Sequence, residues 1–182
     1  MTETSEQAWR APEVKRPSGP NVAGEREAAE GLLDYHRATL LWKCAGLTGE
    51  QLATRSVPPS SMSLLGLVRH LADVERGWFR QKLAKEDVPD LYRTSTSRNG
   101  DFDGVDPAGA EADFSTYAAE VEVARAVLAR YDYDDTFTFR HRNGVEETID
   151  VRALVLHMIE EYARHNGHAD LLRESVDGLT GE

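Results

Sequence analysis

Apolar residues recur three and four positions apart over four stretches of the chain, with polar residues between them. This spacing gives a helix one apolar face. The four stretches cover about 25–46, 60–85, 110–129 and 151–174. The clearest of them carries Leu64, Leu67, Val68, Leu71 and Val74. The pattern therefore predicts four amphipathic helices.

Residues that stop and start helices support these limits. Pro58 and Pro59 separate the first stretch from the second, because proline cannot continue a helix. A serine at position 60, 61 or 63 can cap the second helix, and Asp150 can cap the fourth.

The segments between the helices differ in kind. Residues 136–141 and 145–150 alternate around Asn143-Gly144, a pair typical of tight hairpin turns. Residues 86–109 have no such pattern, and a loop of this length is uncommon unless it is functional or mobile. Its acidic run from Asp101 to Asp106 lacks the spacing of a calcium loop, so we interpret it as solvated.

Four long helices with a small β-hairpin before the last one predict an all-α fold, a four-helix bundle. We assign residues 25–178 to a single domain. Residues 1–24 contain three prolines and no apolar period, so they are expected to form a flexible tail or an arm.

Composition excludes several classes of function. The chain has 32 acidic and 21 basic residues, a net charge of -11, which argues against a nucleic-acid binder. A single cysteine, Cys44, excludes an internal disulfide and an all-cysteine zinc site. No apolar run is long enough to span a membrane, and no signal-peptide core is present, so we expect a cytoplasmic protein. Six histidines remain to be explained.

Two polar residues lie on the apolar side of the fourth helix. At about 100° per residue, His165 lies in the middle of the stripe that contains Met158, and Glu161 lies on the same side. Residues four apart on a helix project together, so this pair can offer one carboxylate and one imidazole to a divalent metal. A hydrogen-bonded Glu–His pair with a purely structural role is the alternative.

His70 is the candidate for a third ligand, because it shares the apolar face of the second helix with Leu67 and Val74. Two histidines and a glutamate leave a fourth position open, as in catalytic zinc sites. His168 is a reserve ligand in place of Glu161. His36 is expected to be a pocket residue or a buried structural histidine, His157 an edge residue and His141 exposed.

Residues 63–79, which include His70 and Trp78, resemble the second-helix signature of the DinB/YfiT-like metalloprotein superfamily. Residues 157–170, with Glu161, His165 and His168, resemble its fourth-helix signature. The nearest branch is the one that includes mycothiol-dependent S-transferases, and the resemblance extends over about 25–178.

This resemblance implies a divalent metal, zinc first and nickel second, held by His70, Glu161 and His165. It leaves open whether His168 replaces Glu161. It further implies a low-molecular-weight thiol similar to mycothiol as cosubstrate, activated for transfer to a small electrophile, with no side chain as nucleophile. Cys44 is then expected to be inert. A homodimer is one oligomeric state that the resemblance leaves open.

The resemblance favours an enzyme, and other functions remain as alternatives. One is a non-catalytic, stress-associated metal-binding protein, and another is a thiol-dependent isomerase. A third is an interaction module whose polar core is structural. We expect no nucleic-acid or membrane partner.

Overall fold

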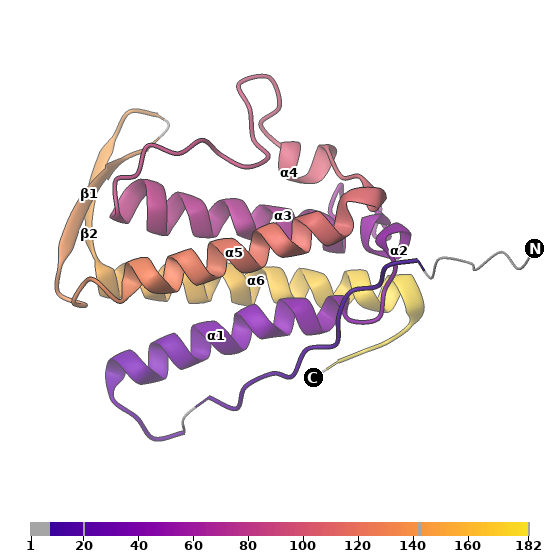
Figure 1. Ribbon diagram of the computed structural model, residues 1–182, viewed down its shortest axis with the longest axis horizontal. Coiled ribbons are helices and arrows are strands. Elements are labelled where there is room, and N and C mark those ends of the chain that lie inside the picture. Colours follow the sequence, from indigo (N-terminus) through magenta and orange to yellow (C-terminus); the bar gives the residue numbers. More distant parts are fainter. Residues whose placement is uncertain (1–7, 20, 142, 182) are drawn as a thin grey trace, which may run out of the picture.

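The computed structural model describes residues 8–19, 21–141 and 143–181. Four long helices form the body of the molecule (Figure 1). They are α1 (Glu25–Cys44), α3 (Leu64–Glu75), α5 (Ala110–Leu128) and α6 (Val151–Asp177). The chain leaves α3 without a break and continues as a π-helix, η1 (Arg76–Leu83). The prediction of an all-α bundle with a hairpin before the last helix is confirmed.

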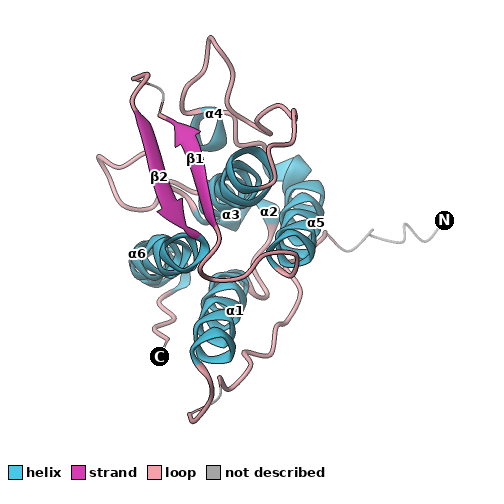
Figure 2. Ribbon diagram, turned by 90° about the vertical axis from the view of Figure 1, so that its left-hand side faces the viewer, coloured by secondary structure: helices cyan, strands magenta, loops and turns pink. Residues whose placement is uncertain are grey.

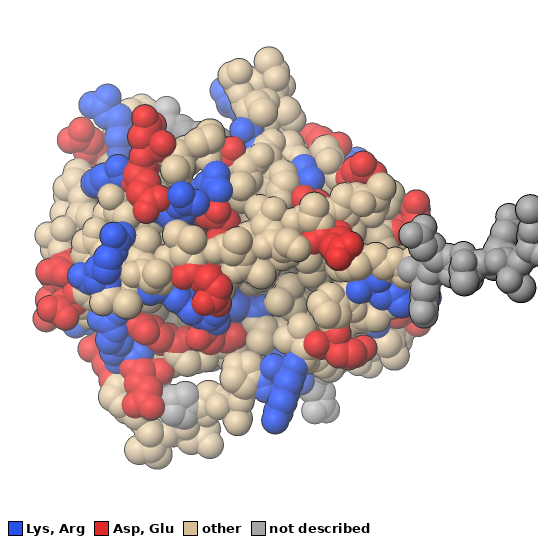
Figure 3. Space-filling model, in the orientation of Figure 1, with Lys and Arg blue, Asp and Glu red and all other residues tan. Residues whose placement is uncertain are grey.

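The long helices pack in two main pairs, α1 against α6 and α3 against α5. Seen from the end that carries the hairpin, they surround a common core (Figure 2). Aliphatic and aromatic side chains from all four fill it, among them Leu33, Leu40, Leu71, Tyr117, Leu154 and Met158. Charged side chains of both signs are interspersed over the face shown in Figure 3. No helix in the described part of the chain is long and apolar enough to cross a bilayer.

Local signals explain where two of these helices begin and where one ends. The Ser63 side chain accepts a hydrogen bond from the backbone N–H of Gly66, and the Asp150 side chain accepts one from Ala153 at 2.7 Å. Both residues are N-caps: Asp150 was predicted, and Ser63 is one of the three serines that were candidates. Helix α6 ends at Gly178, which has a φ of 79°, a left-handed conformation that favours glycine.

Shorter elements interrupt the segments that were predicted to be loops. Helix α2 (Gly49–Ala53) lies between α1 and α3, while α4 (Gly100–Asp103) and the 3₁₀ turn η2 (Pro107–Gly109) lie between η1 and α5. The predicted hairpin is present as antiparallel strands β1 (Thr136–Arg140) and β2 (Glu146–Asp150).

Residues 8–19 lie along the bundle as an arm. The backbone N–H of Ala11 donates to the carbonyl of Leu47, and the N–H of Gly46 donates to the carbonyl of Ala11, each at 2.9 Å. Trp9 packs edge-on against Phe114, with ring centroids 5.3 Å apart. The rest of the predicted tail includes residues 1–7 and 20, which lie outside the described residues.

Candidate metal centre

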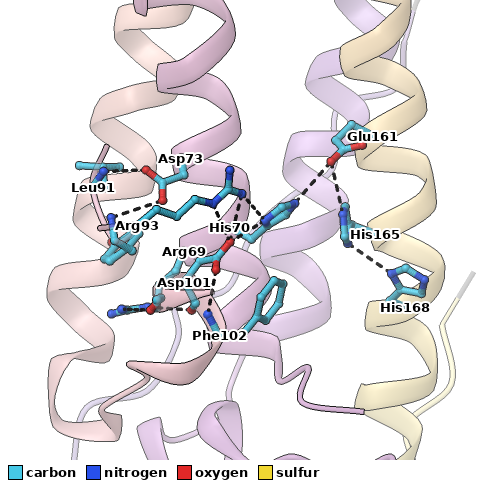
Figure 4. Close-up of polar contacts among 12 residues, drawn as sticks. Arg69, His70, Asp73, Leu91, Arg93, Asp101, Phe102, Glu161, His165 and His168 are labelled. Atoms are coloured by element: carbon cyan, nitrogen blue, oxygen red, sulfur yellow. Dashed lines mark hydrogen bonds and ion pairs between the residues drawn. The ribbon is translucent and has the colours of Figure 1, made fainter. Parts of the chain in front are cut away.

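Helices α3 and α6 bring together the three side chains that the sequence analysis selected. His70 Nε2 lies 3.4 Å from Glu161 Oε1, and His165 Nε2 lies 3.5 Å from the same oxygen. One donor atom from each residue lies within 4.8 Å of the other two. Figure 4 shows His70 pointing from α3 toward Glu161 and His165 on α6.

The position of these side chains follows from the helical spacing. His70 is on the buried side of α3, between Leu67 and Val74, which are both buried. Glu161 and His165 are one turn apart on α6, beside the fully buried Met158. The side chains of His70 and Glu161 are each 14% exposed, and that of His165 is 11% exposed. The group is therefore nearly enclosed, with a small part of each side chain still exposed to solvent.

The separations within the group suit a shared metal ion better than direct hydrogen bonds. Contacts of 3.4 and 3.5 Å are long for hydrogen bonds between nitrogen and oxygen. Bonds of about 2.0–2.2 Å from a four-coordinate zinc ion place neighbouring ligand atoms about 3.4 Å apart. Two imidazoles and a carboxylate also form a donor set that zinc and nickel both accept. The residues thus fit a divalent transition metal.

Asp101 holds the far side of the His70 ring. Its carboxylate accepts a hydrogen bond from His70 Nδ1 at 2.8 Å, which leaves Nε2 as the nitrogen that faces Glu161. The interpretation of Asp101 as solvated is wrong, since the residue is 2% exposed. Burial acts to lower the pKa of His70, but its bonds to Asp101 and Glu161 raise that pKa above its usual value.

Arg93 and Phe102 complete the surroundings of His70. Arg93 Nη2 lies 3.2 Å from Asp101 Oδ2, so the buried carboxylate faces two cationic or donor groups. Phe102 stacks on the His70 ring at a centroid distance of 5.3 Å. Burial acts to raise the pKa of Asp101, whereas His70 and Arg93 lower it below its usual value. These contacts fix the orientation of the imidazole.

His168 lies behind His165. The Nδ1 atoms of the two rings are 3.2 Å apart, and His168 is not among the three residues whose donor atoms converge. Burial first, and then the neighbouring His165, lowers the pKa of His168. On Glu161, the contacts with His165 and His70 hold the carboxyl pKa far below its usual range. Arg164 contacts the second oxygen of Glu161 at 3.1 Å.

The remaining histidines lie apart from this group. His36 is partly buried, and its Nδ1 lies 3.3 Å from the side-chain nitrogen of Asn166. His157 packs against Trp78 with ring centroids 4.5 Å apart. His141 is exposed, as predicted, and contacts Glu147 at 2.6 Å.

A second polar network lies inside the bundle and was not expected from the sequence. Arg37 forms two hydrogen bonds to the carboxylate of Glu75, at 2.8 and 2.7 Å, and Glu75 is fully buried. The Tyr162 hydroxyl donates to Glu75 at 2.7 Å and lies 3.0 Å from that of Tyr117. Charged residues at the positions of Arg37 and Glu75 are ordinary on helix surfaces, so the sequence holds no clear signal of this pair.

Residues of the loop 86–109 are the functional positions that sequence reasoning missed. Arg93, Asp101 and Phe102 all reach the centre from this segment. The only available signal was the unusual length of the loop. Its close fit depends on Gly100, where a Cβ atom would lie 2.1 Å from the carbonyl oxygen of Tyr92.

Comparison with known proteins gives one match. The model of the family described as mycothiol-S-transferase matches residues 28–178, most of the chain and all of the centre described above. No curated protein and no solved structure matched. The match covers far more than half of the 182 residues, and it shows that the chain belongs to the mycothiol S-transferase family of DinB-like bundles.

Proposed function

We propose that this protein is a divalent-metal-dependent enzyme that activates a low-molecular-weight thiol, similar to mycothiol, for transfer to a small electrophile. The observation that carries the proposal is the convergence of three donor atoms within 4.8 Å, from residues that lie in a chain of this family. Family membership supports the thiol and the transfer reaction, and the donor atoms support the metal.

His70, Glu161 and His165 would hold the metal, with zinc as the first candidate and nickel as the second. When bound, such an ion lowers the pKa of a thiol that enters the site, so that the thiolate persists at neutral pH. Three protein ligands leave room for an exogenous group at the fourth position.

The chain's own residues orient and enclose the reactants. Asp101 fixes the ring of His70, and Phe102 covers that ring, so the Nε2 atom is presented toward Glu161. In the transfer, a bond forms between the thiol sulfur and a carbon of the electrophile. The leaving group departs with its electron pair, and the thiol proton passes to solvent.

No cysteine of the chain can replace the external thiol. Cys44 is fully buried at the end of α1, and burial raises its pKa to about 12. The thiolate is the reactive form, so Cys44 is inert at neutral pH. The nucleophile must therefore come from a second substrate.

Metal content and a thiol titration test the proposal. We expect about one equivalent of metal in the purified protein or after reloading, and less than about 0.2 equivalents in His70→Ala and His165→Ala. His36→Gln, which changes a histidine outside the group, should retain the metal. A folded wild-type protein that takes up no transition metal would refute the metal dependence.

Cobalt substitution then tests the role of the thiol. Addition of mycothiol should change the visible spectrum of the cobalt protein, because a sulfur ligand alters the coordination of the ion. A spectrum that no thiol changes would refute the transferase assignment and leave a metal-binding protein without this activity.

A further inference from the structure

A pocket of about 610 Å³ lies between η1, the loop that follows it and the hairpin. It continues into a second hollow of about 590 Å³, which shares Asp90 and Arg93 with the first and reaches Arg98 and Asn143. We call the two hollows together the hairpin pocket. Phe139, Arg140 and His141 of the hairpin line the first hollow.

The hairpin pocket lies next to the candidate metal centre along α3 and η1. Four of its lining residues follow His70 by three, four, seven and eight positions: Asp73, Val74, Gly77 and Trp78. Arg93 contacts both the pocket and the candidate centre. It lines the pocket, and its Nη2 lies 3.1 Å from His70 Nδ1. On α6, His157 packs against Trp78 and precedes Glu161 by one turn. The pocket and the candidate centre are therefore neighbours, although His70, Glu161 and His165 are not among the residues that line the two hollows.

The charge of the pocket is opposite to that of the chain. Its lining contains five basic residues, Lys82, Lys85, Arg93, Arg98 and Arg140, and two acidic ones, Asp73 and Asp90. The whole chain contains 21 basic and 32 acidic residues. Figure 3 shows that, on the face it draws, the hairpin end of the molecule carries both basic and acidic side chains. The lining thus contains about a quarter of the basic residues of the chain and one-sixteenth of its acidic residues.

Two of these cations are not neutralised by the protein. Lys85 Nζ donates to the backbone carbonyl of Thr138, and neither Lys85 nor Arg98 forms an ion pair with a carboxylate of the described residues. By contrast, Arg93 pairs with Asp101 at 3.2 Å. Unpaired cations around a concave surface produce a positive potential that attracts anions.

The backbone conformation of Lys85 also supports a role for its side chain in binding an anion. Lys85 follows the end of η1 with a φ of 58°, in the left-handed region where glycine is the usual residue. Any side chain other than that of glycine costs free energy there. A strained position of this kind next to a site suggests that the side chain is kept for its charge.

We propose that the hairpin pocket binds the anionic group, a carboxylate or a phosphate, of the electrophilic substrate, while the electrophilic carbon reaches the metal centre. This inference rests on the proposed function, because only an enzyme of that kind has an electrophilic substrate. Binding of an anion in the pocket does not depend on that function. Lys85 and Arg98 supply the charges that have no carboxylate partner among the described residues, and Trp78 lines the pocket on the side of His157.

Binding is tested on the full-length protein by NMR titration at constant ionic strength. Sodium succinate, inorganic phosphate and glucose serve as the probes. We expect succinate or phosphate to shift the resonances of the Trp78 indole and of residues 81–85. The probe that binds with the higher affinity shows whether the pocket prefers a carboxylate or a phosphate. Shifts caused by glucose alone, or anion-induced shifts spread over the whole surface, would overturn the proposal.

Variants separate a binding role of Lys85 from a structural one. Lys85→Gly and Arg98→Gln should each weaken anion binding about tenfold, the effect of losing one charged hydrogen bond. Lys15→Gln, which removes an exposed positive charge from the N-terminal arm, should change nothing. Lys85→Gly should also keep or raise the melting temperature, because it relieves the strained backbone. A lower melting temperature with unchanged anion affinity would show that Lys85 is structural.

Turnover of two electrophiles of similar size connects the pocket to the reaction. Iodoacetate carries a carboxylate and iodoacetamide does not, and in both the thiolate displaces iodide. Lys85→Gly and Arg98→Gln should raise the KM for iodoacetate about tenfold and leave that for iodoacetamide unchanged. If neither compound is turned over, the proposed function fails; if both are turned over and respond alike to the variants, this inference fails.

Discussion

The carboxylate of Asp101 accepts a hydrogen bond from Nδ1 of His70 at 2.8 Å, across a separation of 31 positions in the chain. A carboxylate in this position fixes the tautomer of an imidazole and raises its basicity as a metal ligand. The contact ties the loop before α5 to the buried face of α3. It makes the loop part of the candidate centre rather than a connection between helices.

Loss of this carboxylate should weaken metal binding without removing a ligand. We expect Asp101→Asn to lower the metal affinity about 10–100-fold, the usual effect of changing a residue that orients a ligand. Competition with a chromophoric chelator measures the affinity. The matched control is Asp103→Asn on the same short helix, where the exposed carboxylate pairs with Arg55 at 3.3 Å. Equal affinities for both variants would show that Asp101 does not orient His70.

The choice between Glu161 and His168 as third ligand can be tested by a pair of substitutions. Glu161→Gln keeps the shape of the side chain but removes its charge, and it should lower the metal affinity more than about 100-fold. His168→Gln should cost about tenfold, because its ring lies 3.2 Å from Nδ1 of His165, on the side away from Glu161. The same chelator competition applies. A larger loss in His168→Gln than in Glu161→Gln would reverse the assignment.

The ion pair between Arg37 and Glu75 should matter for stability. Glu75→Gln removes the buried counter-charge of Arg37 and leaves it only the partly exposed carboxylate of Asp34, 3.0 Å away, so we expect the free energy of unfolding to fall by about 3–5 kcal/mol. Urea denaturation measures this change. The double variant Arg37→Met/Glu75→Leu should be less destabilised than the single variant, since no charge remains buried. A loss below about 1 kcal/mol in Glu75→Gln would show that the core can solvate Arg37 in another way.

Cys44 should react only when the protein unfolds. Burial raises its pKa to about 12, so the thiolate is scarce at every pH at which the protein is normally handled. We expect no labelling of the native protein by iodoacetamide at pH 8, and one label per chain in urea, measured by mass spectrometry. Labelling of the native protein at the rate of a free thiol would show that the end of α1 opens readily.

The helices were predictable because each carries a strong local signal. The apolar stripe of α3 and the caps Ser63 and Asp150 act over a few residues, so the sequence alone places them. The short helices α2 and α4 were not predicted, although α2 carries a local signal in the capping box of Thr48 and Gln51. A helix of one turn gains little from its own hydrogen bonds and forms because the rest of the bundle holds it.

The same distinction applies to the candidate centre. His70, Glu161 and His165 stand out because polar side chains on an apolar stripe need a partner, and that anomaly is visible in the sequence. Asp101 gives no such signal, because an aspartate among glycines and other aspartates is typical of a solvated loop. Its burial depends on the path of a segment that has no periodic pattern, and only the folded chain shows that path.

The π-helix η1 has a consequence for how such proteins can change. A π-helix bonds each residue to the fifth one before it, so each of its hydrogen-bonded rings encloses one residue more than in an α-helix. A single deletion within Arg76–Leu83 can therefore be absorbed by a return to α-helical winding, with the helix still intact. The residues after the deletion, including Lys85, would then largely keep their orientation relative to His70, whereas a deletion in an α-helix would turn them by about 100°. A change of one residue in the length of this segment can thus be tolerated while His70 and the candidate centre stay in place.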